Sequence, residues 1–331
     1  MKKVFSKRLG VYQKVFLIWI GIVSFYVQAK GQKDTAKIGC YISSLYDFNL
    51  SENTFKTDFY LWSIYNKNAP FNFEKEIEIM NTNSVSMEGT SVDTTGNSLW
   101  FYSKIKAELR KIWRTVDYPF DRQRLLISIE SSEYDTSGLV FLCDKKNSKM
   151  NDSAIIRLNE WELLGSSFFV TSTKYDTNFG NPESEASSSN SCFNIEISLA
   201  RKNSWLILFK LITGLLVAFT ISCCVFFIKP NNVDPRFGLA VGGLFAAIGN
   251  KYIVEGIVPS TNSVTMMDSI HNLTFIYLFI IIIVSVYSLY LYEKETAESR
   301  AKSIKVDRYS LIAIFFSYFL ILTGILYSHL G

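Results

Sequence analysis

The sequence predicts a β + α membrane protein, in which an exported domain of β-strands precedes a bundle of four transmembrane helices. Three observations lead to this fold class. Of the 331 residues, 48% are hydrophobic and only 19% are charged, whereas about a quarter of the residues of a soluble domain carry charge. Long apolar runs occupy the chain after residue 204. Before that point, apolar and polar residues alternate as they do in half-buried strands.

The N-terminus has the pattern of a targeting signal. Its basic residues are Lys2, Lys3, Lys7, Arg8 and Lys14. The apolar stretch Val15–Val27 follows them, and the small residue Ala29 offers a cleavage point. This stretch is shorter than the roughly 20 residues that a membrane span needs. We therefore predict a signal peptide at 1–29, with an uncleaved anchor as the alternative, and either one exports the residues that follow.

Residues 30–204 have the pattern of strands and turns. Apolar side chains alternate with polar ones along Phe193–Ala200 and Leu125–Glu130, and Phe55–Tyr65 is rich in aromatic and β-branched residues. Clusters of Ser, Asn, Gly and Asp predict turns at 81–98, 131–138 and 176–191. A domain of this size with such strands predicts a β-sandwich or barrel. The polar segment Asn178–Ser191 predicts a mobile loop that projects from the sheet edges.

Four apolar runs in residues 205–331 are long enough to cross a bilayer as helices. They are 205–228, 237–258, 273–292 and 309–327. Basic residues lie between the first and second runs and between the third and fourth, namely Lys229, Arg236, Lys294, Arg300, Lys302, Lys305 and Arg308. The remaining loop and the C-terminal tail have none. The positive-inside rule therefore predicts a multi-pass protein of the plasma (inner) membrane, with the N-terminal domain and the C-terminus on the extracellular or periplasmic side.

Several classes of function lack support in the sequence. The net charge of +4, without a dense basic stripe, argues against a nucleic-acid partner. No HExxH, GxSxG or P-loop motif is present and no CxxC pair predicts a metal site, so we expect no enzyme, cofactor or metal. The exported cysteines Cys40, Cys143 and Cys192 could form one disulfide and leave one free thiol. Cys223 and Cys224 fit small apolar residues at lipid depth.

One segment carries a resemblance to a known family. The sequence Tyr118-Pro119-Phe120-Asp121-Arg122-Gln123, followed by the strand-like LLISIE, resembles the signature loop of pentameric ligand-gated ion channels, the Cys-loop receptor superfamily. Lys111 and Leu125 stand where animal members carry the flanking cysteines, as in the prokaryotic branch that lacks this disulfide. Tyr41–Tyr65, Asn159–Gly165, Arg201, the four spans and Val258-Pro259 match the family in their order and spacing.

The resemblance implies an extracellular immunoglobulin-like β-sandwich at 30–204 that binds a small ligand, above a four-helix bundle. It implies a homopentamer in contact with membrane lipid, with permeant ions crossing along the second span. It also implies that Pro119, Phe120, Asp121 and Arg201 couple the two parts, with Pro119 and Phe120 wedged against the outer loop Pro259–Asp268. Two separate surface charges at Asp121 and Arg201 are the alternative. The usual proline of the first span and the usual Trp-x-Pro motif between residues 75 and 100 are absent.

The second span is glycine-rich on one side. With about 100° between successive residues, seven side chains share a stripe about 80° wide. They are Asp234, Gly238, Gly242, Phe245, Gly249, Tyr252 and Gly256. Small residues around an axis, with aromatic rings at Phe245 and Tyr252 closing it, fit a pore with a hydrophobic gate. A close-packing helix surface at Gly238-x-x-x-Gly242 is the alternative.

Charges flank this stripe. A ring of Asp234 carboxylates at the inner mouth would favour cations, although Arg236 lies close enough in sequence to oppose it. Both side chains could instead be solvated residues at the end of a helix. Near the outer end, Lys251 and Glu255 have the spacing of a pair on one helix face.

Aromatic residues are the candidate ligand contacts, because several aromatic rings can cage a cationic ligand between subunits. They are Tyr60, Trp62, Phe101, Tyr102, Tyr175 and Phe179. Aromatic residues on strands can equally belong to the core. His271 could report pH or cap the third span. The functional alternative to a channel is a non-conducting membrane receptor that binds a solute with the same β-sandwich.

Overall fold

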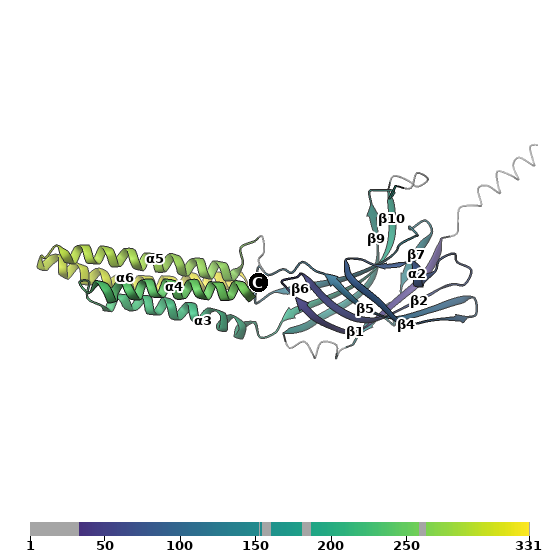
Figure 1. The fold of residues 1–331 in the computed structure, drawn as a ribbon, viewed down its shortest axis with the longest axis horizontal. Helices are drawn as coiled ribbons and strands as arrows, with labels where there is room; N and C mark the ends of the chain where they lie inside the picture. Colours follow the sequence, from purple (N-terminus) through teal and green to yellow (C-terminus); the bar gives the residue numbers. More distant parts are fainter. Residues whose placement is uncertain (1–32, 152, 154–159, 181–186, 258–262, 331) are drawn as a thin grey trace, which may run out of the picture.

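The computed structural model describes residues 33–151, 153, 160–180, 187–257 and 263–330. It has two parts in line, a domain of strands and a bundle of long helices (Figure 1). The predicted signal peptide at 1–29, Asn159 and the Val258-Pro259 exit from the second span lie outside the described residues.

Two sheets form the N-terminal part. The first has the order β4-β5-β2-β1-β7, with β8 also paired to β1, and the second has the order β3-β6-β10-β9. The strands are β1 (Asp34–Asn49), β2 (Thr54–Asn66), β3 (Ile77–Ile79), β4 (Thr82–Thr95), β5 (Ser98–Arg110), β6 (Arg122–Ser131), β7 (Leu139–Cys143), β8 (Lys149–Met150), β9 (Trp161–Tyr175) and β10 (Ser188–Arg201). The short helix α2 (Phe73–Glu76) precedes β3. The prediction of a strand-built domain is confirmed.

The core lies between the two sheets. Alternate residues of β2, such as Phe55, Phe59 and Leu61, are fully buried, as are Ile127 of β6 and Ile195 of β10. Because successive side chains of a strand point to opposite faces, the period-two pattern places one apolar row of β2, β6 and β10 in this core.

One predicted turn is wrong. The Ser- and Thr-rich segment 82–95 is the edge strand β4, which pairs with β5 through two register shifts. Its side chains are mostly exposed on both faces, so it lacks the apolar alternation that marks a strand. Polar residues and bulges are common on edge strands because they hinder pairing with another chain.

The three cysteines of the strand domain do not pair. Cys40, Cys143 and Cys192 are all free thiols, as are Cys223 and Cys224. Burial raises the pKa of the Cys40 thiol and, together with the nearby Glu130 carboxylate, that of Cys192. Both thiols are therefore protonated and unreactive at neutral pH.

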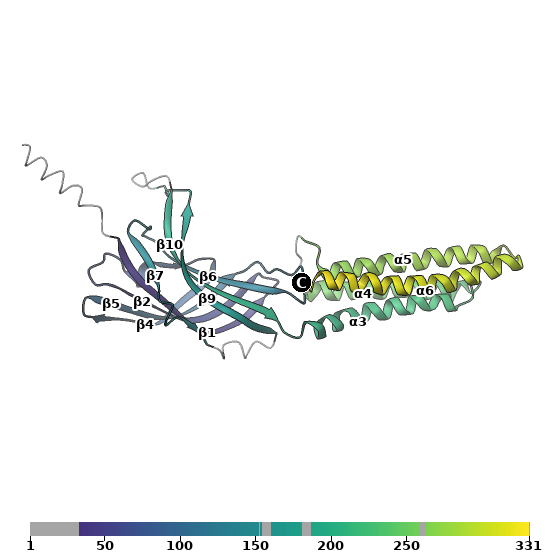
Figure 2. The ribbon, with the colours of Figure 1, turned by 180° about the vertical axis from the view of Figure 1, so that it is seen from behind.

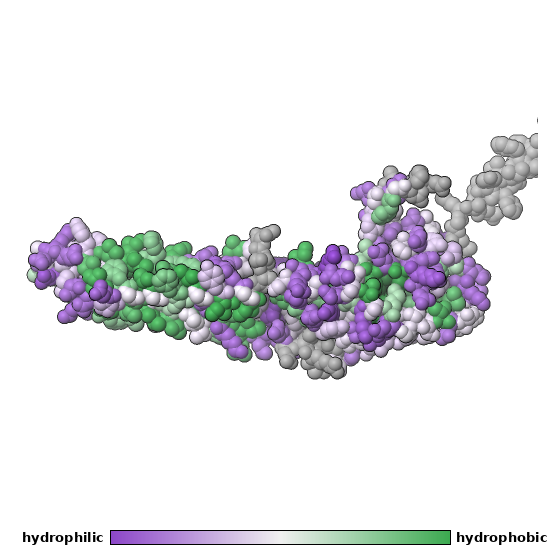
Figure 3. Space-filling view, viewed as in Figure 1, coloured by the Kyte–Doolittle hydropathy of each residue, from purple (hydrophilic) through white to green (hydrophobic). Residues whose placement is uncertain are grey.

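Four long helices form the C-terminal part, and each is long and apolar enough to cross a membrane. They are α3 (Ser204–Cys223), continued by the 3-10 turn η2 (Cys224–Phe227), α4 (Val233–Ile257), α5 (Met266–Glu293) and α6 (Ala297–Ser328). Figure 3 shows an apolar band on the bundle between the polar tip and the polar sheet domain. The C-terminal end of α6 returns to the sheet domain (Figure 2). The arrangement is that of a multi-pass membrane protein.

Helices α4, α5 and α6 begin before the predicted spans. The largest difference is in α6, which begins at Ala297 and not at Tyr309. The basic residues between 300 and 308, predicted as a linker, are helical. Hydropathy locates the part of a helix that lies in lipid, whereas the helix itself continues until a cap ends it.

Candidate functional site

Helix α4 has two opposite faces. Its buried residues are Arg236, Ala240, Gly243, Ala247 and Val254. The predicted stripe lies on the far side of the helix, about 180° around the axis, and every member of it is exposed in the isolated chain. The bundle therefore leaves the glycine stripe uncovered.

The glycines of the stripe face open space. Apart from the backbone of α4 itself, a Cβ atom added at Gly238, Gly242, Gly249 or Gly256 would meet no atom of the described residues within 4 Å. At Gly243 on the buried face, the same atom would lie 1.9 Å from Ser222 Oγ and 2.9 Å from the Ala218 carbonyl oxygen. Close packing between helices of one subunit thus explains Gly243 but none of the stripe glycines.

Two aromatic side chains interrupt the stripe. Phe245 is 66% exposed and Tyr252 is 71% exposed. Beside them, the predicted pair of Lys251 and Glu255 is confirmed, with Nζ and Oε1 3.5 Å apart, and Lys251 also lies 3.9 Å from Asp268 of α5. The C-terminal half of α4 therefore presents bulky rings on one side and a charged cluster on another.

Arg236 does not act as a solvated residue at the helix end, so that interpretation is wrong. Its side chain is fully buried and donates to both carboxylate oxygens of Asp307 on α6, at 2.9 and 2.7 Å. Its Nη1 also donates to the Ile228 carbonyl oxygen at 2.9 Å. Asp234, in the first turn of α4, remains exposed. Arg236 is thus paired on the buried face of α4, and Asp234 is the charged residue of the stripe.

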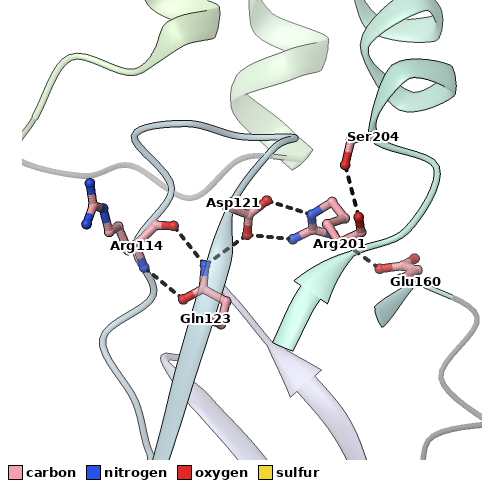
Figure 4. A network of polar contacts seen from close by, with 6 residues as sticks. All are labelled: Arg114, Asp121, Gln123, Glu160, Arg201 and Ser204. Atoms are coloured by element: carbon pink, nitrogen blue, oxygen red, sulfur yellow. Dashed lines mark hydrogen bonds and ion pairs between the residues drawn. The ribbon is translucent and has the colours of Figure 1, made fainter. Parts of the chain in front are cut away.

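Asp121 and Arg201 meet where the sheet domain joins the bundle (Figure 4). Arg201 Nε donates to Asp121 Oδ1 at 2.8 Å and Nη2 donates to Oδ2 at 3.3 Å. The guanidinium lies 4.7 Å from the Tyr118 ring centre and 4.3 Å from that of Trp161. Both charged side chains are nearly fully buried. The alternative of two separate surface charges is wrong, while the coupling role stays a prediction.

Further contacts fix the geometry of this ion pair. Gln123 donates from Nε2 to Asp121 Oδ2 at 2.8 Å and to the Arg114 carbonyl oxygen at 2.7 Å, and it accepts from the Arg114 amide at 3.2 Å. A fully hydrogen-bonded buried pair specifies one register, although it adds little net stability. Since Arg201 ends β10 and Ser204 begins α3, the pair sits at the covalent link between the two parts.

The loop that carries the signature sequence touches the bundle at several points, and one of them is Asp117 Oδ1, which lies 2.7 Å from Nδ1 of His329 at the end of α6. The Met266 amide at the start of α5 donates to the Val116 carbonyl oxygen at 2.8 Å. The Phe120 ring stands edge-on to Trp205 of α3, with ring centres 5.0 Å apart. Phe120 thus packs against the first helix, whereas residues 259–262 of the loop it was predicted to meet lie outside the described residues, so that contact stays a prediction. Pro119 is buried beside it.

The six predicted ligand aromatics fall into three groups. Tyr60, Trp62 and Tyr102 are half-buried on the outer face of the first sheet, where Tyr60 and Tyr102 stack with ring centres 5.6 Å apart. Tyr175 and Phe179 belong to the β9–β10 hairpin of the other sheet. Phe101 is fully buried in the core, so its assignment as a ligand contact is wrong. Its strand neighbour Tyr102 faces outward because side chains alternate along β5.

A cavity of about 920 Å³ opens beneath the β9–β10 hairpin. Its wall includes Glu133, Tyr134 and Asp135 from the turn before β7, and Lys174 and Phe179 from the hairpin. The sequence identified residues 131–138 only as a turn. Glu133 and Asp135 flank Tyr134 shortly after β6, and this grouping of two carboxylates around an aromatic ring could have predicted the wall of a binding site.

A buried acid contacts the end of β9, where the hairpin meets its connecting loop. Tyr175 donates its hydroxyl proton to Glu130 Oε2 at 2.8 Å, and Glu130 is only 3% exposed. Burial and this carboxylate raise the pKa of Tyr175 to about 12, so the phenol stays protonated and can hold the contact. The hairpin is therefore tied to β6, the strand that follows the signature loop.

No protein-family model matches the chain, and no curated protein matches its sequence. The architecture of a two-sheet domain followed by four apolar helices is compatible with that of pentameric ligand-gated ion channels.

Proposed function

We propose that this chain is the subunit of a homopentameric, ligand-gated ion channel of the Cys-loop receptor superfamily, with α4 lining the pore. In this proposal the strand domain is an immunoglobulin-like sandwich on the outer side of the cell membrane. The order of the elements, the signature loop at the junction and the uncovered face of α4 support it together.

The observation that carries the proposal is the stripe of glycines with open space in front of it. A glycine destabilises a helix by about 1 kcal/mol relative to alanine. Four glycines on one exposed face are therefore expected only where small size serves a function. In lipid, larger apolar side chains would serve better. Around a shared axis, small residues leave room for water and ions.

Phe245 and Tyr252 are the proposed gate. Both rings project from the stripe, and rings from five subunits would narrow the axis at two heights. A hydrophobic constriction stops ions because a hydrated ion cannot exchange its water for hydrocarbon. Tilting or turning α4 would move the rings apart and open the path.

Asp234 gives the proposed channel its preference for cations. Arg236, the charge that could oppose it, is paired with Asp307 on the other side of the helix. A ring of exposed carboxylates at the inner mouth raises the local concentration of cations.

The proposed ligand site lies between the hairpin cavity of one subunit and the aromatic face of the next. The cavity supplies Glu133, Asp135 and Phe179, and the neighbouring sheet would supply Tyr60 and Tyr102. Hydrogen bonds from Ser137 lower the pKa of Asp135, so it stays charged. Carboxylates beside aromatic rings favour a small cationic ligand. Binding would move the hairpin, and the Asp121–Arg201 junction would pass that movement to α3.

Current measurement on the purified protein in planar bilayers tests the proposal. Small amines are added on the side of the sheet domain, and the reversal potential in a salt gradient reports selectivity. We expect amine-dependent cation current, and a larger resting current in Phe245→Ala because its ring no longer closes the axis. A folded pentamer that binds an amine without carrying current in either form would instead be a non-conducting receptor.

A further inference from the structure

One polar side chain of α4 joins three helices in the outer half of the bundle. Asn250 Nδ2 donates to the Leu211 carbonyl oxygen of α3 at 3.1 Å. Its Oδ1 lies 3.1 Å from Nε2 of His271 on α5. Since the amide group donates to Leu211, Oδ1 is an acceptor and His271 Nε2 is the donor. Both ends of the carboxamide are therefore used.

The neighbouring helices are shaped to receive this carboxamide. On α3, a Cβ atom added at Gly214 would lie 2.9 Å from Asn250 Nδ2, so only glycine leaves the space free. On α5, His271 is 1% exposed, and its second ring nitrogen lies 2.8 Å from the Met267 carbonyl oxygen. Both neighbouring oxygens can only accept, so the ring donates to Asn250 and to Met267 at the same time only in its imidazolium form.

Close packing holds α4 at Gly243, about 10.5 Å along the helix from Asn250. The flanking residues of the buried face, Ala240 and Ala247, are small and present little relief to the other helices. Hydrogen bonds depend on direction, whereas contacts between small apolar groups do not. The buried Arg236–Asp307 pair fixes the inner end, but it lies about 21 Å from Asn250 along the helix.

We propose that Asn250 is a positioning residue that fixes the rotation of the outer half of α4. It lies about 120° around the helix from the stripe, at a height between Phe245 and Tyr252. Its hydrogen bonds to α3 and α5 prevent α4 from turning, so that the stripe and both rings keep facing the axis. The inference rests on the proposed channel function, because it presumes that the stripe faces water.

Cysteine reactivity measures this rotation. Phe245→Cys places a thiol on the stripe, and Ala246→Cys places one about 100° away at the same height. The full-length protein in nanodiscs is treated with a water-soluble, positively charged methanethiosulfonate. Modification at each position is followed by peptide mass spectrometry. The ratio of the rates at 245 and 246 then reports which side of α4 faces water, and a value well above one is expected with Asn250 intact.

Asn250→Leu removes both hydrogen bonds and should lower this ratio about fivefold or more. Gly214→Ala tests the contact from the other side, since its added methyl displaces the carboxamide. Alanine favours the helix, so this variant keeps the test available if Asn250→Leu does not fold. Thr274→Val is the matched control. It removes a buried hydrogen bond to Tyr318 that joins α5 to α6 and leaves α4 untouched, so the ratio should not change.

Each outcome decides between the claims. A ratio that falls in the Asn250 and Gly214 variants but not in Thr274→Val supports the positioning role. An unchanged ratio in both, or an equal fall in Thr274→Val, overturns that role and leaves the channel proposal standing. A ratio near one with Asn250 intact overturns the pore orientation itself, and the positioning role with it.

Discussion

Helices α4 and α6 are both poorly covered by the rest of the bundle, yet they expose different chemistry. The exposed surface of α6 includes Phe316, Leu320 and Tyr327, each at least 70% exposed. The exposed stripe of α4 is built from four glycines and two aromatic residues. Helix α4 is also the least hydropathic of the four spans.

This difference fits the proposal of two environments around one bundle. Large apolar side chains suit contact with lipid chains, so the outward face of α6 fits the membrane. A stripe of glycines exposes backbone and forms no apolar surface of its own. Residues of α4 and α6 are thus similarly exposed in one chain for different proposed reasons. Large apolar side chains mark the face of α6 that we place in lipid, and glycines mark the face of α4 that we place at the axis.

The largest expected effect comes from the pair that connects these two helices. Asp307→Asn removes the carboxylate from a fully buried Arg236 and should lower the free energy of unfolding by about 3–5 kcal/mol. Thermal unfolding in detergent measures it. The double variant Arg236→Met/Asp307→Leu should recover most of the loss, because no charge then remains buried. Equal stability of Asp307→Asn and the parent would mean that the pair is solvated and does not join α4 to α6.

A carboxylate placed on each face tests its environment. Leu320→Asp puts a charge where we place lipid, at a cost of about 2.5–3.5 kcal/mol for insertion, and should sharply reduce the yield of folded protein in membranes. Gly242→Asp puts the same group on the stripe, where water would solvate it, and should retain most of the yield. If the two variants lose yield equally, both faces contact lipid and the distinction between them fails.

Two glycines of α4 provide the smallest and most local test. Gly249→Ala adds a methyl group to open space and should stabilise the helix by about 1 kcal/mol. Gly243→Ala forces its methyl group against Ser222 and should destabilise by about 1–3 kcal/mol. Unfolding midpoints of the assembled protein measure both. Destabilisation by Gly249→Ala would show that the stripe packs against another helix in the assembly.

The sequence predicted features that depend on local pattern. Period-two alternation located β6 and β10, aromatic and β-branched content located β2, and hydropathy located four spans. The Lys251–Glu255 pair followed from helical spacing alone. The stripe could be drawn on a helical wheel because every α-helix has the same periodicity. The helical wheel could not predict which face of α4 is buried, because this depends on how α3, α5 and α6 surround the helix.

Long-range contacts were the part that sequence reasoning missed. Arg236 and Asp307 lie on different helices, and each taken alone has the pattern of a solvated residue near a helix end. Phe101 and Tyr102 are adjacent aromatics on one strand, and only the second sheet decides which one is buried. Asn250 did carry a signal, since a polar residue within an apolar span is often functional, but its partners on α3 and α5 could not be predicted.

The central claim is that α4, and not α6, surrounds a water-filled axis. A reconstruction of the purified assembly in lipid nanodiscs by electron cryomicroscopy tests it directly. The account predicts five copies, with α4 innermost, an open axial path in front of Gly238, Gly242, Gly249 and Gly256, and the large apolar side chains of α6 in the surrounding lipid. Another number of copies, or stripe glycines in contact with a neighbouring helix and no axial path, would contradict it.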